Sequence, residues 1–184
     1  MELIQLILWK IKSVNRLHTF KLELKMNHID LSLQKIESIF NSTSTILQGM
    51  SLGETTTRTS LSHRVAPSYA LTGAFLYPTL MFLFRDYPGM EIGSKGVLKV
   101  AEVDATQHIK NCLSSIRDIF EEADKIIQNV NVGEQIFTTN IAKTLGEKFE
   151  IKSSVLYMTL QFLFNDYPGI VIKTGRSGGL KKIY

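Results

Sequence analysis

The sequence contains a single cysteine, Cys112, among its 184 residues. One cysteine excludes an intramolecular disulfide framework and a cysteine-rich zinc site. The four histidines stand at positions 18, 28, 63 and 108, and none of these spacings is typical of metal ligands. The apolar N-terminal run is interrupted by Lys10 and Lys12, well short of the roughly 20 residues that a membrane span needs. The sequence therefore predicts no metal, no cofactor and no stable membrane insertion.

Charge of either sign is also modest. Hydrophobic residues make up 44% of the chain and charged residues 21%, which excludes a disordered or collagen-like chain and is typical of a globular one. The net charge is +4 and the sequence pI about 9.1, a balance compatible with an anionic partner such as nucleic acid. We expect a cytoplasmic protein, or a nucleoid or nuclear one if it binds DNA.

An internal repeat organises the chain. Shifted by 80 residues, LMFLFRDYPGMEI at 80–92 falls on LQFLFNDYPGIVI at 160–172. The alignment extends without a gap over 28–92 and 108–172, where 23 of 65 positions are identical. Such self-similarity predicts a tandem duplication. The expected boundaries are an N-terminal extension over 1–26, a first repeat over 27–106 and a second repeat over 107–184.

The extension has no counterpart in the second repeat. It carries five basic and two acidic residues, a net charge of +3. Three interpretations stay open: an amphipathic element that packs on the body, a membrane-surface anchor, and an upstream addition to a protein that starts at Met26. In each case a chain that starts at Met26 is expected to keep its stability, because no core position of either repeat lies upstream.

Each repeat shows the same periodicities. In the second, apolar spacing predicts a helix over 107–129, followed by a short extended piece over 134–137. Two further helices are expected, from Thr138 to Leu145 with Gly146 as the stop, and from Ser153 or Ser154 to about Asp166. A Tyr-Pro-Gly turn then leads to strands over 170–173 and 180–184. The first repeat has a shorter hairpin, with strands over 90–92 and 97–100.

This order of elements resembles the winged-helix variant of the helix-turn-helix. The resemblance covers both repeats and rests on the element order and on the turn and hairpin after the third helix. It implies a mainly α fold with small β-hairpins (α+β), made of two winged-helix domains in tandem. It also implies that the third helix of a repeat faces the DNA major groove while the wing touches phosphate or the minor groove.

The third helix has one face that the repeats share and one that they do not. The shared residues are mostly large and apolar, as a core face requires. The positions that differ include four that recur at i, i+4, i+7 and i+11, which is one stripe of a helix. The second repeat places Ser154, Met158, Gln161 and Asn165 there, and the first places Ala74, Pro78, Met81 and Arg85.

The second repeat suits DNA contact better than the first. Its stripe can hydrogen-bond base edges, and its hairpin is basic. The expected DNA-binding residues are Lys152, Ser154, Gln161, Asn165, Lys173, Arg176, Lys181 and Lys182. The first repeat is expected to be a structural or dimerising partner, although Arg58, Arg64, Lys95 and Lys99 could touch phosphate. The leading hypothesis is a non-enzymatic binder of double-stranded DNA that regulates transcription or replication.

The main alternative is a protein-interaction module, similar to the tandem winged-helix subunits of chromosome-condensing complexes. In that case the helix face and wing bind a protein partner, or the first repeat forms a homodimer. No catalytic constellation is evident. We expect Cys112 to be a buried, inert thiol, His28 and His108 to pack or cap helices, and the two Asp-Tyr-Pro-Gly motifs to be helix stops.

Overall fold

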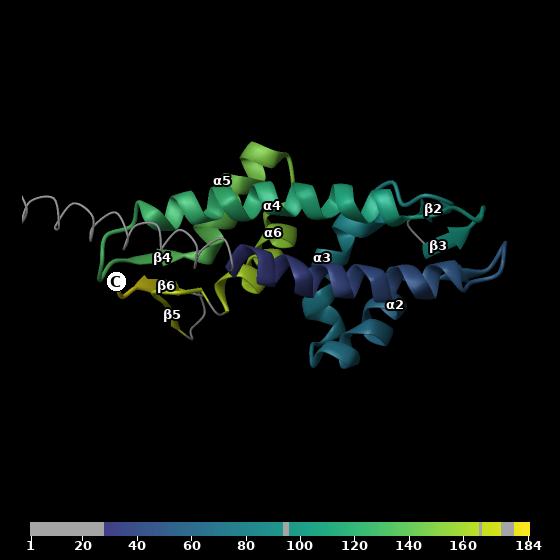
Figure 1. Cartoon of the computed structure of the whole chain (residues 1–184), viewed down its shortest axis with the longest axis horizontal. Coiled ribbons are helices and arrows are strands. Elements are labelled where there is room, and N and C mark those ends of the chain that lie inside the picture. Colours follow the sequence, from purple (N-terminus) through teal and green to yellow (C-terminus); the bar gives the residue numbers. More distant parts are fainter. Residues whose placement is uncertain (1–27, 94–95, 166, 174–178) are drawn as a thin grey trace, which may run out of the picture.

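The computed structural model describes residues 28–93, 96–165, 167–173 and 179–184. The predicted extension over 1–26, together with Lys95 and Arg176, lies outside these residues. Two long helices run side by side along the long axis, and small sheets lie near opposite ends (Figure 1). No helix within the described ranges is both long and apolar enough to span a membrane.

The first half of the molecule follows the predicted order. A helix covers residues 28–48, and β1 (Thr55–Thr56) and α2 (Arg58–Val65) follow it. A 3₁₀ turn, η1 (Ala66–Tyr69), leads to α3 (Gly73–Phe84). The hairpin β2 (Met90–Gly93) and β3 (Gly96–Lys99) completes an antiparallel sheet of order β1-β3-β2.

The second half repeats this order. It contains α4 (Thr106–Gln128), β4 (Gln135–Phe137), α5 (Thr138–Phe149) and α6 (Ser153–Phe164). The hairpin β5 (Ile170–Lys173) and β6 (Gly179–Lys182) forms an antiparallel sheet of order β4-β6-β5. The described chain is thus mainly helical with two small three-stranded sheets, which confirms the predicted α+β class.

One helix boundary differs from the prediction, at Gly146. Gly146 does not end α5, which continues to Phe149 and ends at Glu150 with a left-handed φ of 54°. A Cβ at Gly146 would lie 2.7 Å from the carbonyl oxygen of Ile151, so glycine there permits a close approach. Pro78 lies inside α3, beyond its first turn, and therefore removes one intrahelical hydrogen bond.

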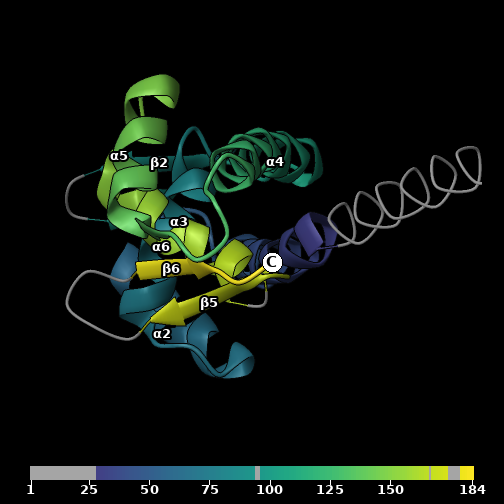
Figure 2. The ribbon, with the colours of Figure 1, turned by 90° about the vertical axis from the view of Figure 1, so that its left-hand side faces the viewer.

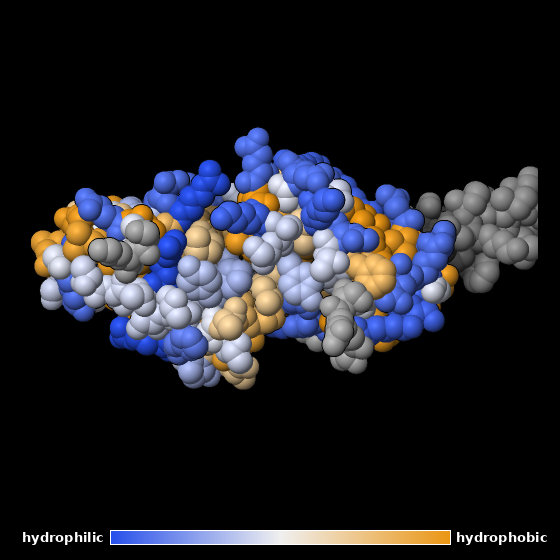
Figure 3. All heavy atoms as spheres, turned by 180° about the vertical axis from the view of Figure 1, so that it is seen from behind, coloured by the Kyte–Doolittle hydropathy of each residue, from blue (hydrophilic) through white to orange (hydrophobic). Residues whose placement is uncertain are grey.

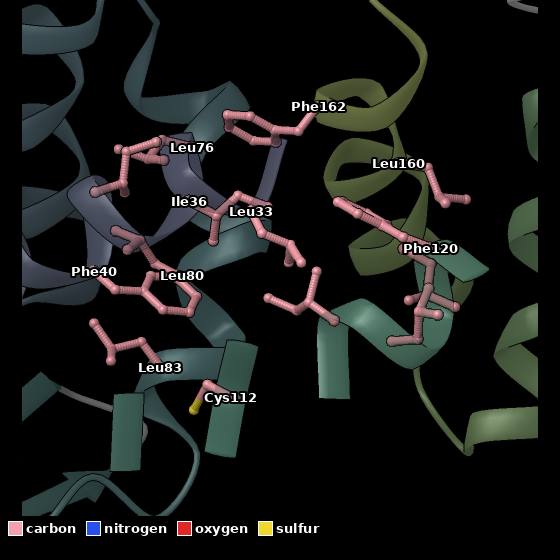
Figure 4. Packing of buried hydrophobic residues seen from close by; sticks show 14 of the residues in the cluster. Leu33, Ile36, Phe40, Leu76, Leu80, Leu83, Cys112, Phe120, Leu160 and Phe162 are labelled. Carbon is pink, nitrogen blue, oxygen red and sulfur yellow. The ribbon is translucent and has the colours of Figure 1, made fainter. Parts of the chain in front are cut away.

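The third helices of the two halves pack against each other at the centre. The hydroxyls of Thr79 and Thr159, which are 80 residues apart, lie 3.2 Å from each other and are fully buried. Equivalent residues that meet in this way mark an approximate two-fold axis between α3 and α6. Beside it, the rings of Phe75 and Phe162 lie with their centroids 5.4 Å apart. Figure 4 shows Phe162 of α6 turned toward Leu76 of α3.

Each long helix bridges both halves. His28 donates from Nε2 to the carbonyl of Leu163, and Ser32 donates to the carbonyl of Phe162 at 2.9 Å. The equivalent contacts on the other side join His108 to the carbonyl of Leu83 at 2.8 Å and Cys112 to that of Phe82 at 3.3 Å. The first turns of each long helix thus satisfy carbonyls in the last turn of the opposite third helix. The buried core is therefore shared by the two halves.

Candidate nucleic-acid interface

Of the predicted DNA-contact residues, Ser154, Gln161 and Asn165 belong to α6 and its C-cap, on the side of the molecule opposite the long helices. Figure 2 shows the two long helices on one side, and α2, α3, α5 and α6 on the other. We call the latter the four-helix face. Figure 3 views it: the middle is mostly pale or blue, and the strongest orange lies toward the two ends. The centre of this face is therefore not a continuous apolar patch.

The stripe predicted on α6 is accessible at both ends and partly covered in the middle. Ser154 and Asn165 are exposed, whereas Met158 and Gln161 are half-buried. The reason is that α6 packs between α3 and α5 rather than projecting from the surface. Lys152 is exposed at the start of the helix, where it takes the N-cap position without a side-chain capping bond.

The lysines of the second hairpin differ in whether their ammonium groups bond the protein itself. Lys173 is exposed and Lys181 is half-buried. The ammonium of Lys182 instead donates to the carbonyls of Ile127, Gln128 and Val130 at 3.4, 2.9 and 2.7 Å. The carbonyl of Ile127 also accepts from the N–H of Val130, so the cation chiefly satisfies the carbonyls of Gln128 and Val130, and it interacts favourably with the helix dipole.

The same arrangement occurs in the first half. The ammonium of Lys99 donates to the carbonyls of Gln48 and Met50 at 2.5 and 2.7 Å and lies 2.7 Å from the carboxylate of Glu102. Sequence reasoning missed this role because the gapless offset of 80 does not align the second strands of the hairpins. An insertion of three residues in the longer hairpin would have placed Lys99 on Lys182.

Acidic residues are distributed unevenly between the two sides. The sequences of α2, α3 and α6 contain no Asp or Glu. By contrast, α4 contains Asp118, Glu121, Glu122 and Asp124. Three of the four helices on the four-helix face therefore present no negative charge of their own to an approaching anion.

The Asp-Tyr-Pro-Gly motifs are structural. The Tyr87 hydroxyl lies 2.6 Å from that of Ser44, and its ring meets His108 edge-on at 5.5 Å between centroids. Burial raises the pKa of Tyr87. The equivalent Tyr167 donates to Asp124 and meets the ring of His28 at 5.4 Å. Each tyrosine is therefore held by its own half and by the histidine of the other.

Cys112 and His108 do not form a catalytic dyad, although both line a cleft of about 420 Å³ beside α3 and α4. Burial raises the pKa of the Cys112 thiol to about 11, so little thiolate exists near neutral pH. His108 Nε2 lies 3.6 Å from the sulfur but donates to the carbonyl of Leu83, and a donor nitrogen cannot take the thiol proton. Across the described residues, no three His, Cys, Asp or Glu side chains cluster as a metal site would require.

Comparison with known proteins adds no assignment. No protein-family model, no curated protein and no solved structure matches the chain.

Proposed function

We propose that this protein is a non-enzymatic binder of double-stranded DNA that regulates transcription or replication, built from two winged-helix units in tandem. The support for the two units is the order helix, strand, helix, helix and hairpin, with the same sheet order in both halves. In this arrangement the third helix and the hairpin of one unit are neighbours, so they can contact one duplex together.

The observation that carries the proposal is the charge on the four-helix face. Three of its helices lack acidic residues, and the neighbouring hairpin β5–β6 contains three lysines and no acid in its described strands. Lys152, Lys173 and Lys181 supply phosphate contacts, and the predicted contact of Arg176 is carried over on its sequence position alone. Lys182 is left out, because its ammonium caps α4.

Base contacts are assigned to α6. The exposed Ser154 and Asn165 and the half-buried Gln161 are all able to hydrogen-bond base edges. Because α3 packs along one side of α6, only the outer face of α6 can lie over the DNA groove. The helix cannot insert into the groove with its full circumference. This geometry favours few base contacts and a large electrostatic share of the affinity.

A salt series tests the proposal. Fluorescence anisotropy with a duplex pool should show affinity that falls steeply with salt, with a log–log slope near −0.9 for each phosphate contact. The double variant Lys173→Ala/Lys181→Ala should flatten that slope by up to about 1.8 and weaken all sequences alike. Absence of salt-dependent duplex binding by the unmodified protein would overturn the proposal and favour the protein-interaction alternative.

A second arm separates base reading from charge. After selection of preferred duplexes from a random pool, Gln161→Ala should reduce the preference by about 1–3 kcal/mol and leave the salt slope unchanged, because a base-edge contact releases no counterion. The matched control is Met81→Ala at the equivalent position of α3. This control should alter neither quantity, since a methionine side chain makes no paired hydrogen bonds to a base.

A further inference from the structure

We infer that the DNA site is not confined to the second half, and that α2 of the first half completes it along one basic edge of the molecule. This inference rests on the proposed DNA binding. We define the basic edge as α2 together with the hairpin β5–β6. It assigns the nucleic-acid contact to residues that lie more than 100 positions apart in the sequence.

The two elements lie along the same long edge of the molecule. In Figure 1, α2 and β5–β6 lie along the lower edge, while α5 and the hairpin β2–β3 lie along the upper one. Figure 2 agrees, with α5 and β2 at the top and α2 and β5 at the bottom. The approximate two-fold axis through Thr79 and Thr159 exchanges the two edges. By backbone fold alone, the two edges would therefore be equivalent surfaces.

Charge makes the edges different. The described strands of β5–β6 and α2 carry five basic residues and no acid. Of these five, Lys182 caps α4, which leaves Arg58, Arg64, Lys173 and Lys181. On the opposite edge, α5 and β2–β3 carry three basic and two acidic residues. Two of those three cations are already engaged, because Lys148 pairs with Glu122 at 2.5 Å and Lys99 is 1% exposed beside Glu102. An anionic backbone is therefore attracted more strongly to the basic edge than to the opposite one.

The α2 helix is also placed beside the third helices. Arg58 Nη1 lies 3.9 Å from the sulfur of Met81, a residue of the α3 stripe. Arg64, in the last turn, is exposed, as are the hydroxyl-bearing Thr59 and Ser60. Guanidinium and hydroxyl groups are common partners of phosphate oxygens. α2 therefore offers the same kind of contact at one side of α3 and α6 as the second hairpin offers at the other.

The size of the molecule suits duplex DNA. The helix over 28–48 spans about 30 Å at about 1.5 Å per residue. That length corresponds to roughly nine phosphate steps of one strand at about 3.4 Å each. A duplex of about 16 base pairs is therefore longer than this helix and long enough to present phosphates to both ends of the basic edge.

The test uses the full chain and such a 16-base-pair duplex. Arg58→Ala/Arg64→Ala should flatten the log–log salt slope by up to about 1.8, and its effect should add to that of Lys173→Ala/Lys181→Ala. Lys143→Ala is the matched control, because Lys143 is an exposed cation on α5, the counterpart of α2 on the opposite edge. It should leave the slope unchanged. Arg58→Lys/Arg64→Lys should restore the slope, and a thermal melt confirms that each variant is folded.

The outcomes are distinguishable. Unmodified protein that shows no salt-dependent binding overturns the proposed function itself. Salt-dependent binding that Arg58→Ala/Arg64→Ala leaves intact overturns only the basic edge and confines the site to the second half. A slope that Lys143→Ala flattens by about 0.9, the value of one phosphate contact, also overturns the basic edge, because the contact would then be spread over both edges.

Discussion

At the scale of single residues, several positions that the two halves share pack the halves against each other or cap their helices. His28 and His108 each donate to a carbonyl at the end of the opposite third helix. Lys99 and Lys182 each cap the long helix of their own half. A lysine in a basic hairpin can therefore be a structural cation, and its neighbour Lys181 a free one.

This distinction gives a prediction about stability. Lys182→Ala removes charge-assisted hydrogen bonds to carbonyls at the end of α4, so it should lower the free energy of unfolding by about 1–3 kcal/mol. Lys181→Ala, one residue away, should change it by less than about 0.5 kcal/mol. Urea denaturation of the three proteins measures both values. Equal effects of the two replacements would contradict the capping role.

At the scale of elements, ion pairs join α4 to the other long helix and to α5. At its middle, Arg117 pairs with Asp30 of the other long helix at 2.7 Å. Further along, Glu122 accepts from Lys125 of the same helix and from Lys148 of α5, each at 2.5 Å. The hydrogen bonds from these lysines lower the pKa of Glu122 from its ordinary value of 4.5 to about 2.

The lowered pKa of Glu122 predicts a pH dependence. A carboxyl with a lower pKa in the folded state stabilises the fold fully above its unfolded pKa, and this contribution disappears as pH falls from about 4.5 to about 2. Glu122→Gln should therefore be less stable than the unmodified protein at pH 6, and the difference should shrink by pH 3.

Urea denaturation at the two pH values measures this change. Glu121→Gln, at the exposed neighbouring position, is the control. At pH 6 its free energy of unfolding should differ less from that of the unmodified protein than that of Glu122→Gln does. If the difference in free energy of unfolding between Glu122→Gln and the unmodified protein stays constant from pH 6 to pH 3, the ion pairs are not its cause.

At the scale of the whole molecule, the two halves share one core. The N-terminal turns of each long helix contact the third helix of the opposite half, and α3 meets α6 through Thr79 and Thr159. The halves cannot separate without exposing these buried groups to water. We therefore expect the two halves to unfold together.

The cooperativity of unfolding tests this view. Calorimetry should show a single transition whose calorimetric and van't Hoff enthalpies agree. Leu80→Ala, at a fully buried position of α3, should cost about 2–5 kcal/mol. Hydrogen exchange should then show the same loss of protection at core amides of α6 as at those of α3. A second half that keeps its protection would show two independent folding units.

Part of the architecture was determined by the sequence alone. Apolar periodicity located α4 to within a residue at each end, because a long amphipathic helix repeats its signal over many turns. The predicted Tyr-Pro-Gly turn is present, and its Gly169 has a left-handed φ of 78°. The shared face of the third helix was also predicted correctly: Leu156, Leu160 and Leu163 are fully buried.

The remaining features depend on which surfaces meet, and local sequence does not record this. The low helix propensity of glycine predicts that the helix ends at Gly146. Gly146 nevertheless lies inside α5, where the chain returns close to it at Ile151. From the sequence alone Lys182 is predicted to contact phosphate, but the fold places the end of α4 beside it, and its ammonium bonds the carbonyls there. The packing of α3 on α6, and the alignment of α2 with β5–β6 along one edge, join segments far apart in the chain. Only the tertiary structure decides these, because burial and charge act through distance in space.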